Sequence, residues 1–279
     1  MDKKYRLSEK TLTINGHILH EIIAIKDFKD VKTGDHGGFI EHEDNLNQYD
    51  TSWVYDHGIV YGHAKVYGNA SVHDNACVCD NAHVFDNAKI YKKAKIYGNA
   101  KVYGCAHIDV ESKVYGNAEV SGNAQVFYFS HVYQNAIIKG NAIVSEWAQV
   151  YGNARIGSNA TIHGDARVYG NALVYGSSLI TGCSEVTGIA SIGGDINIDD
   201  NACVCSNNDI LLIGPIGEDS NSITFFRTKD TNIGVCYKLF HGSIAEFKQD
   251  ILRSYSDTNI RTLFNMAITL AESKLTNKQ

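Results

Sequence analysis

The sequence predicts a long all-β solenoid followed by a small α+β domain, and three observations predict it. Valine or isoleucine occupies every sixth position from Val54 to Ile210 without a slip in register. A small residue stands two positions before each of them, with Ile196 and Asn208 as the exceptions. The period stops near residue 210, after which short strand-like runs give way to helical patterns. Self-similarity at a fixed period is typical of proteins whose repeats stack on one another.

The six-residue unit, Ala-x-Val-Tyr-Gly-Asn in its commonest form, explains why the chain would wrap around a core. Valine and isoleucine favour extended backbone, and residues two apart in a strand point to the same side. The alanine and the valine therefore face inward, and the residues on either side of the valine face outward. A pair such as Gly68-Asn69 or Gly98-Asn99 follows the strand. Because both residue types tolerate positive φ, this pair turns the chain. The repeat thus predicts a prism over residues 53–210.

The segment before the repeat, residues 1–52, is predicted to be an N-terminal β cap. Asn15-Gly16 separates two strand-like runs, Thr11–Ile14 and His17–Ile25, which is a hairpin signal. A solenoid ends in an exposed strand edge, and such an edge pairs with other chains unless something covers it. We therefore expect this segment to cover the first coil.

Residues 211–279 are predicted to form an α+β domain. Its strands are expected at Asp209–Ile213, Ser222–Arg227 and Ile233–Phe240. Ser243 and Glu246 have the spacing of a capping box that opens a helix. The buried face of this helix is expected to contain Ile244, Phe247, Ile251 and Leu252. A second helix is expected over Thr258–Leu275, with an inward face made of Ile260, Leu263, Phe264, Ala267, Ile268 and Ala271.

Composition narrows the class of protein. The 279-residue chain has a net charge of −6, which argues against general nucleic-acid binding, a property of basic proteins. No segment has transmembrane length and the first residues lack an apolar stretch, so the expected location is cytoplasmic, with no membrane partner. Seven cysteines include two Cys-Val-Cys pairs far apart along the repeat. Each pair offers only two thiols, so no metal site is predicted and the cysteines are expected to be free.

The repeat, the opening Tyr5–Ser8, the segment Ala24–Phe28 and the run Gly37–Ile40 resemble bacterial and phage hexapeptide-repeat proteins. This resemblance implies a left-handed parallel β-helix in which three hexads form one triangular coil, and hence about nine coils here. It also implies a homotrimer as the usual assembly. Members of the family are often described as transferases although no activity is agreed for them.

The last part of the chain resembles a domain that follows such repeats in phage and prophage proteins. The resemblance rests on the segments Phe225–Asp230 and Phe240–Ser243. In those proteins Cys-Gly-Cys precedes the phenylalanine, whereas this chain has Tyr237-Lys238-Leu239. The resemblance implies a phage or prophage origin. From its position after the repeat, the domain is expected either to cap the other end of the prism or to recruit a protein partner.

A stripe of tyrosines is expected on one face of the prism. We number the faces by their first core residue, so that Val54, Val60 and Val66 begin the first, second and third face. On the second face, the residues that follow the core valine at 18-residue spacing are Tyr97, Tyr115, Tyr133, Tyr151 and Tyr169, with Lys95, Lys113 and Arg167 beside them. Three interpretations stay open: a homotrimer interface, a solvated ladder that serves only the fold, or a platform for a small anionic ligand.

The corner after the first face departs from the Gly-Asn consensus in mid-prism, and such departures from a local rule suggest function. The residues expected to converge there are Phe127, Tyr128, Phe129, Trp147, Glu146 and Asp109. They predict either a small-molecule pocket or a surface that packs against a neighbouring subunit or the terminal domain.

Two histidines are the candidates for a general base. His107 and His163 lie in or near this corner, each close in sequence to a carboxylate, Asp109 or Asp165. Imidazole suits proton transfer near neutral pH. Hexapeptide acyltransferases, however, typically carry a loop excursion from the solenoid, and the repeat here is uninterrupted.

The favoured function is therefore a non-catalytic scaffold or binding protein, and no cofactor is predicted. One alternative is an acyltransferase that uses acyl-CoA. Another is a phage protein that sequesters a nucleotide-like signal to counter host defence.

Overall fold

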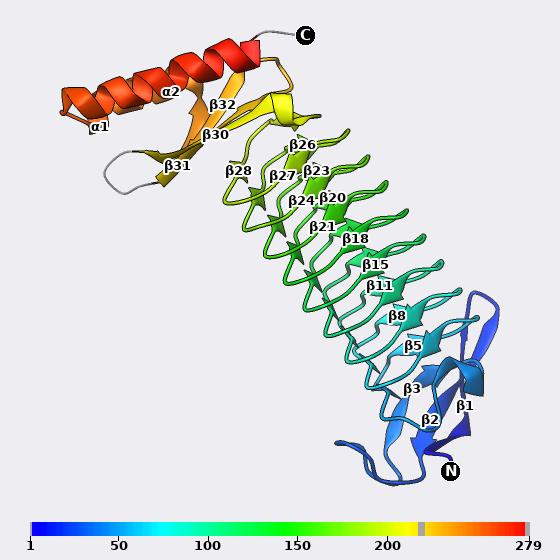
Figure 1. Cartoon of the computed structure of the whole chain (residues 1–279). Helices are drawn as coiled ribbons and strands as arrows, with labels where there is room; N and C mark the ends of the chain where they lie inside the picture. The colour runs from blue at the N-terminus through cyan, green and yellow to red at the C-terminus, as the bar shows by residue number, and fades with distance from the viewer. Residues whose placement is uncertain (1, 217–220, 277–279) are drawn as a thin grey trace. The chain divides into compact units, whose positions relative to one another are not determined.

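The computed structural model describes residues 2–216 and 221–276. It contains a parallel β-solenoid of about nine turns, followed by a small antiparallel sheet and two helices (Figure 1). The predicted parallel solenoid and the appended α+β domain are thus confirmed. The chain divides into two compact units, Met1–Gly152 and Asn153–Gln279, which are described separately. No helix within the described ranges is long and apolar enough to cross a membrane.

Each solenoid strand is two residues long and ends in a buried valine or isoleucine. In the first unit, the first face contains β4 (Trp53–Val54), β7 (Ser71–Val72), β10 (Lys89–Ile90), β13 (His107–Ile108), β16 (Gln125–Val126) and β19 (Ile143–Val144). The second face contains β5 (Ile59–Val60), β8 (Cys77–Val78), β11 (Lys95–Ile96), β14 (Lys113–Val114), β17 (His131–Val132) and β20 (Gln149–Val150). The third face contains β6 (Lys65–Val66), β9 (His83–Val84), β12 (Lys101–Val102), β15 (Glu119–Val120) and β18 (Ile137–Ile138).

The solenoid part of the second unit also has three faces, which we number by the same repeat positions. Its first face contains β22 (Thr161–Ile162), β25 (Leu179–Ile180) and β28 (Asn197–Ile198). Its second face contains β23 (Arg167–Val168), β26 (Glu185–Val186) and β29 (Cys203–Val204). Its third face contains β21 (Arg155–Ile156), β24 (Leu173–Val174) and β27 (Ser191–Ile192).

The corners explain why the six-residue unit needs glycine and asparagine. Gly98 has φ +69°, and a Cβ there would lie 2.9 Å from the Gly116 nitrogen of the next coil. The asparagines that follow the glycines form columns along the corners. Asn81 Nδ2 donates to Asn99 Oδ1 at 3.1 Å, and Asn99 Nδ2 donates to Asn117 Oδ1 at 3.0 Å. Each coil is therefore tied to its neighbours at its strands and at its corners.

The N-terminal segment contains the predicted hairpin, made of β1 (Tyr5–Ile14) and β2 (His17–Ala24). The strand β3 (His36–Ile40) then pairs antiparallel with β2 and parallel with β5. After the short 3-10 helix η1 (Glu43–Asn45), Leu46 forms a parallel bridge to Val66. The first, irregular coil thus begins inside the segment that the sequence assigned to the cap.

Two buried charged side chains, Lys4 and Glu21, form ion pairs within this cap. The Lys4 side chain is fully buried, and its Nζ donates to Ser52 O at 2.6 Å and to Asp50 Oδ1 at 3.0 Å. Glu21, only 5 % exposed, accepts from Lys10 Nζ at 2.7 Å and contacts His36 Nδ1 at 2.7 Å. Burial alone would raise the pKa of Glu21, but these two partners outweigh it and lower that pKa below 4.5.

In the second unit the repeat ends one hexad before the last periodic residue. After β29 comes the 3-10 helix η2 (Asn207–Asp209), and Ile210 opens a longer strand instead of another solenoid rung. The antiparallel sheet contains β30 (Ile210–Ile216), β31 (Asn221–Arg227), β32 (Ile233–Tyr237) and β33 (Phe240–Ser243). The single strand expected over Ile233–Phe240 is thus a hairpin, which turns at Lys238 with φ +54°.

Two helices complete the domain, α1 (Ile244–Ser254) and α2 (Thr258–Thr276). The predicted capping box is present at Ser243 and Glu246. Phe247 and Ile251 are buried with most of the expected α2 residues, Phe264, Ala267, Ile268 and Ala271. Ile244 and Ile260 are partly buried against this core. The prediction was wrong for Leu252 and Leu263, which are 53 % and 50 % exposed, because the buried stripe of each helix is narrower than we expected.

Candidate functional site

The tyrosine stripe of the second face is an aromatic ladder. In the first unit, Tyr97, Tyr115, Tyr133 and Tyr151 follow the core residues of consecutive strands on one face. Their ring centroids are 4.7, 4.9 and 4.8 Å apart, and neighbouring rings are within 9° of parallel. We call these four residues the tyrosine ladder. Burial raises the pKa of Tyr97 and Tyr115. The ladder is thus a flat, half-buried surface whose ring edges reach solvent.

The remaining stripe residues lie around this ladder or in the second unit. Lys95 and Lys113 are the residues that precede the core position in β11 and β14, directly beside the tyrosines. In the second unit, the Tyr169 hydroxyl donates to Glu185 Oε2 at 3.1 Å, and Arg167 lies 4.0 Å from the same carboxylate. Of the basic side chains predicted beside the tyrosines, Arg167 therefore has its charge partly neutralised by Glu185.

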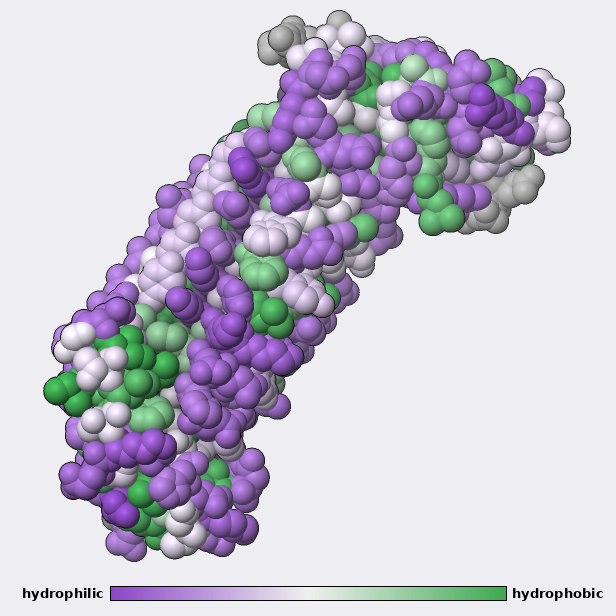
Figure 2. Space-filling model, turned by 180° about the vertical axis from the view of Figure 1, so that it is seen from behind, coloured by the Kyte–Doolittle hydropathy of each residue, from purple (hydrophilic) through white to green (hydrophobic). Residues whose placement is uncertain are grey.

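The N-terminal hairpin covers the same face before the ladder begins. Leu12 and Ile14 of the hairpin pack against a buried cluster of Leu19, Phe39 and Tyr61. Cys77 and Cys79 of the second face pack against the same cluster. The rings of His17 and Tyr61 are 4.9 Å apart. Figure 2 shows hydrophobic side chains gathered near the end of the molecule that holds β1 and β2. A strand pair with aliphatic side chains thus fits this face of the solenoid.

The aromatic corner contains two separate ring pairs. Phe129 and Trp147 are stacked with centroids 4.4 Å apart, and Phe127 contacts Tyr128 edge to face at 5.2 Å. Trp147 is 58 % exposed and Tyr128 is 48 % exposed. The corner therefore presents an exposed aromatic ridge, on which Tyr128 and Glu146 hold left-handed backbone with φ of 58° and 61°.

The candidate bases differ in their surroundings. His107 Nε2 is buried without a hydrogen-bond partner and lies 3.5 Å from Asp109 Oδ2. Lys92 Nζ lies at the same distance from that carboxylate oxygen. In the second unit, His163 Nδ1 lies 3.2 Å from the Thr181 hydroxyl. A base must reach its substrate with an accessible ring nitrogen, and the buried Nε2 atom of His107 does not meet this requirement.

A groove on the first face was missed by the sequence analysis. Its aromatic wall is formed by Tyr55, His73 and Tyr91, whose neighbouring rings are stacked at 4.2 and 4.4 Å. Lys29 and Asp30 of the cap close one end. We call this hollow of about 550 Å³ the first-face groove, and its other lining residues are Thr51, Asn69, Ser71, Asn87 and Lys89. The same 18-residue spacing that revealed the tyrosine stripe would have revealed its aromatic wall.

The charges in the first-face groove are unevenly compensated. The Tyr55 hydroxyl donates to Asp30 Oδ1 at 2.7 Å, and this hydrogen bond lowers the pKa of Asp30. Lys29 Nζ donates to Asn69 O at 2.8 Å. Burial lowers the pKa of Lys29, the charges of Asp30 and Asp50 raise it, and the charge of Lys89 lowers it by a smaller amount. Burial between the two tyrosines also lowers the pKa of His73 below 6.5, which keeps this ring neutral at pH 7.

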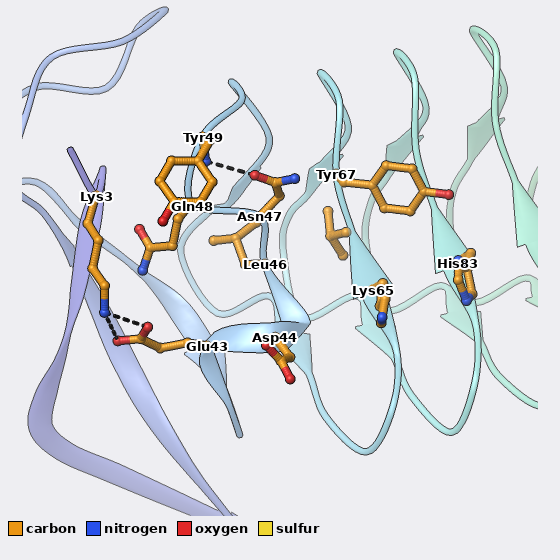
Figure 3. Close-up of a pocket in the computed structure, with 11 residues that line it drawn as sticks. Lys3, Glu43, Asp44, Leu46, Asn47, Gln48, Tyr49, Lys65, Tyr67 and His83 are labelled. Carbon is orange, nitrogen blue, oxygen red and sulfur yellow. Dashed lines mark hydrogen bonds and ion pairs between the residues drawn. The ribbon is translucent and has the colours of Figure 1, made fainter. Parts of the chain in front are cut away.

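A second groove of about 510 Å³ lies on the third face, where Tyr67 begins another aromatic column (Figure 3). Figure 3 shows Glu43 and Asp44 on the cap side and Lys65 and His83 on the solenoid side. Lys3 Nζ pairs with Glu43 Oε2 at 2.7 Å. Acidic and basic groups are therefore balanced in this third-face groove.

The Cys-Val-Cys pairs remain separate, one in each unit, and all seven cysteines are free. Cys203 Sγ lies 3.9 Å from Cys205 Sγ. Among the residues that the structure describes, no group of three or more histidine, cysteine, aspartate or glutamate side chains is placed to hold a metal ion.

Comparison with known proteins supports the repeat architecture. Residues 148–164 and 166–182 match the family model described as YdcK Beta solenoid repeat. Each matched segment is close to one coil in length, so the match identifies the coil as the repeating unit. No curated protein matches the chain.

Proposed function

We propose that this protein is a non-catalytic binding scaffold that assembles with further copies of itself through the tyrosine ladder. The observation that carries this proposal is the regular stacking of Tyr97, Tyr115, Tyr133 and Tyr151 on one flat, half-exposed face. Tyrosine supplies a large, amphipathic contact area and is enriched at protein interfaces.

A second copy of the chain suits this surface for a geometric reason. The ladder repeats about every 4.8 Å, the spacing between neighbouring strands. Another solenoid presents outward side chains at the same spacing, so contacts made on one coil can recur on the next. The hairpin already shows that aliphatic side chains, such as Leu12 and Ile14, pack on this face. The homotrimer implied by the family resemblance would use this mode of contact.

The regularity of the solenoid supports a role other than catalysis. A two-residue strand recurs every six residues from β4 to β29, with no loop long enough to form a lid or a substrate arm within this span. His107, one of the two candidate bases, has its Nε2 atom buried. The acyltransferase alternative predicts binding of acyl-CoA that is lost when His107 and His163 are both changed to Asn. The phage origin and the sequestration of a nucleotide-like signal stay predictions.

The proposal is tested by native mass spectrometry and by light scattering coupled to size exclusion. The wild-type chain is expected to be a homotrimer, and Tyr133→Arg is expected to give monomers because it places a charge inside the interface. The matched control is Tyr103→Arg, which changes a ring stacked on Phe85 on the third face. A wild-type chain that stays monomeric at micromolar concentration, or equal dissociation by both variants, would contradict assembly through the ladder.

The C-terminal domain offers a place for a protein partner. The outward side of α2 carries Met266 and Leu270, which are 65 % and 54 % exposed and line a shallow hollow. Exposed apolar side chains that cluster on one helix are typical of interaction sites. We keep a partner at this domain as part of the scaffold proposal.

A further inference from the structure

The first-face groove has the composition of an anion site. Two ammonium groups, those of Lys29 and Lys89, face one hollow and are close enough that the charge of Lys89 lowers the pKa of Lys29. The carboxylate that lines the hollow, Asp30, already accepts the Tyr55 hydroxyl. Lys89 makes no ion pair in residues 2–216 and 221–276. Asp30 keeps its negative charge when it accepts the Tyr55 hydroxyl, and both Asp30 and Asp50 raise the pKa of Lys29. Two lysines and one aspartate line the groove, so the side chains that line it carry a net charge of +1, which an anion would neutralise.

An amide donor, that of Asn87, also lines the groove. Asn69 Nδ2 donates to Asn87 Oδ1 at 3.1 Å, as in the other asparagine columns. The position one coil further along is Cys105, so the Asn87 amide meets no asparagine acceptor there. The column resumes at Asn123, which donates to Asn141. The break leaves a donor at the edge of the groove.

The aromatic wall favours an organic anion over a bare one. Tyr55, His73 and Tyr91 are stacked on one another, so their edges, rather than their faces, are turned to the groove. Ring edges carry partial positive charge and contact the face of an aromatic ligand in the edge-to-face arrangement. His73 is neutral at pH 7, so its ring repels neither an organic anion nor a bare anion.

We propose that the first-face groove binds a small aromatic phosphate monoester. Its phosphate lies between Lys29 Nζ and Lys89 Nζ within reach of the Asn87 amide, and its ring lies along Tyr55, His73 and Tyr91. Phosphate oxygens accept several charge-assisted hydrogen bonds at once, which suits two ammonium groups and an amide. The volume of about 550 Å³ fits a ligand of small-molecule size. The third-face groove lacks this excess of positive charge. This site shares no residue with the tyrosine ladder, so it stands or falls independently of the proposed assembly.

The test is isothermal titration calorimetry of the full chain with phenyl phosphate, inorganic phosphate and phenol. Phenyl phosphate is expected to bind saturably and more tightly than inorganic phosphate, and phenol is expected not to bind. Lys89→Gln should weaken phenyl phosphate binding by about tenfold, the size of one charge-assisted hydrogen bond. Tyr91→Ala should remove the preference for phenyl phosphate over inorganic phosphate.

The control is Lys101→Gln, because Lys101 occupies on the third face the repeat position that Lys89 occupies on the first. It lies outside both grooves and should leave binding unchanged. If Lys89→Gln and Lys101→Gln weakened phenyl phosphate binding equally, binding would depend only on the general charge of the protein. That result would overturn the proposed site. Loss of binding in Lys65→Gln alone would move the ligand to the third-face groove. Absence of saturable binding to the wild-type chain would also overturn the proposal.

Discussion

The tyrosine ladder and the aromatic wall of the first-face groove are built by the same rule and end in different surfaces. Both place rings at 18-residue spacing after the core residue, and both stack them less than 5 Å apart. On the face of the ladder, the described cap residues pack with Tyr61, Cys77 and Cys79, before the ladder begins, and the ladder itself stays flat. The column at Tyr55 meets Lys29 and Asp30 of the cap and becomes one side of a hollow. The repeat thus supplies rings, and a non-repetitive neighbour turns them into a site.

The largest expected effect comes from detaching the cap. Lys4→Met removes a buried charge and leaves Ser52 O without the ammonium donor. Asp50 loses the same ammonium group but keeps its hydrogen bonds from Ser52 and from Gly68 N. Breaking a buried pair of this kind typically costs about 3 kcal/mol of unfolding free energy. Urea denaturation measures it, and Lys3→Met, which breaks an exposed pair with Glu43, is the control. A loss no larger than in Lys3→Met would show that the cap is held by other contacts.

A smaller effect is expected from acid. The pKa of Glu21 is lowered in the folded chain, so its charged form stabilises the fold fully above the unfolded value near 4.5. This contribution is lost as pH falls below 4.5 through the lowered value. Glu21→Gln should lower the free energy of unfolding by about 2 kcal/mol at pH 7, because Lys10 and His36 then contact a neutral amide instead of a carboxylate. The variant should also lose less stability than the wild type between about pH 5 and pH 3, which we call the acid limb. Thermal melts from pH 7 to pH 3 measure both. An unchanged acid limb in this variant would contradict the assignment.

Removing one ring from each column separates their roles. Tyr115→Ala and His73→Ala should each cost about 1 kcal/mol of stability, the usual value of an aromatic pair beyond its buried area. Only Tyr115→Ala should shift the assembly measured by native mass spectrometry, and only His73→Ala should weaken phenyl phosphate binding. If both variants changed both properties, the two surfaces would not be independent.

The smallest effect on stability is expected from restoring the missing asparagine at position 105 of the corner column. Cys105→Asn should let position 105 accept from Asn87 and donate to Asn123, which restores the column on both sides. Each added exposed hydrogen bond contributes about 0.5 kcal/mol at most. The melting temperature should therefore rise slightly, while phenyl phosphate binding weakens because the Asn87 amide is occupied. A lower melting temperature would show that cysteine suits this corner better.

The six-residue period allowed the strands, their register and the stacked tyrosines to be predicted, because each residue of a coil lies beside the residue one coil away. The start of the solenoid was less predictable. Leu46 and Val54 are eight residues apart, so the first coil, with Ile40 and Leu46, does not keep the period. In the terminal domain, Leu252 and Leu263 carry the helical pattern but lie outside the narrow stripe that the small sheet covers.

The first-face groove could not be predicted as a hollow for a different reason. The spacing of Tyr55, His73 and Tyr91 is readable, but the position of Lys29 depends on how the cap folds back over the first coil. The cap is not a repeat, so no periodicity places it. The predicted corner residues Phe129 and Trp147 do meet, but their exposure depends on what the corner packs against, which spacing does not encode.

The uniform six-residue unit also means that a residue's face depends on how many hexads precede it. Removing residues 100–105 would delete β12 with its core Val102 and leave every other strand, turn and core residue intact. It would nevertheless move Tyr115, Tyr133 and Tyr151 from the second face to the first. Tyr97 would then lose its stacking partner, Tyr115. Removing a whole coil of eighteen residues would only shorten the prism by one step. Insertions and deletions in such a chain are therefore expected to comprise whole coils of eighteen residues, because only these keep each side chain on its face.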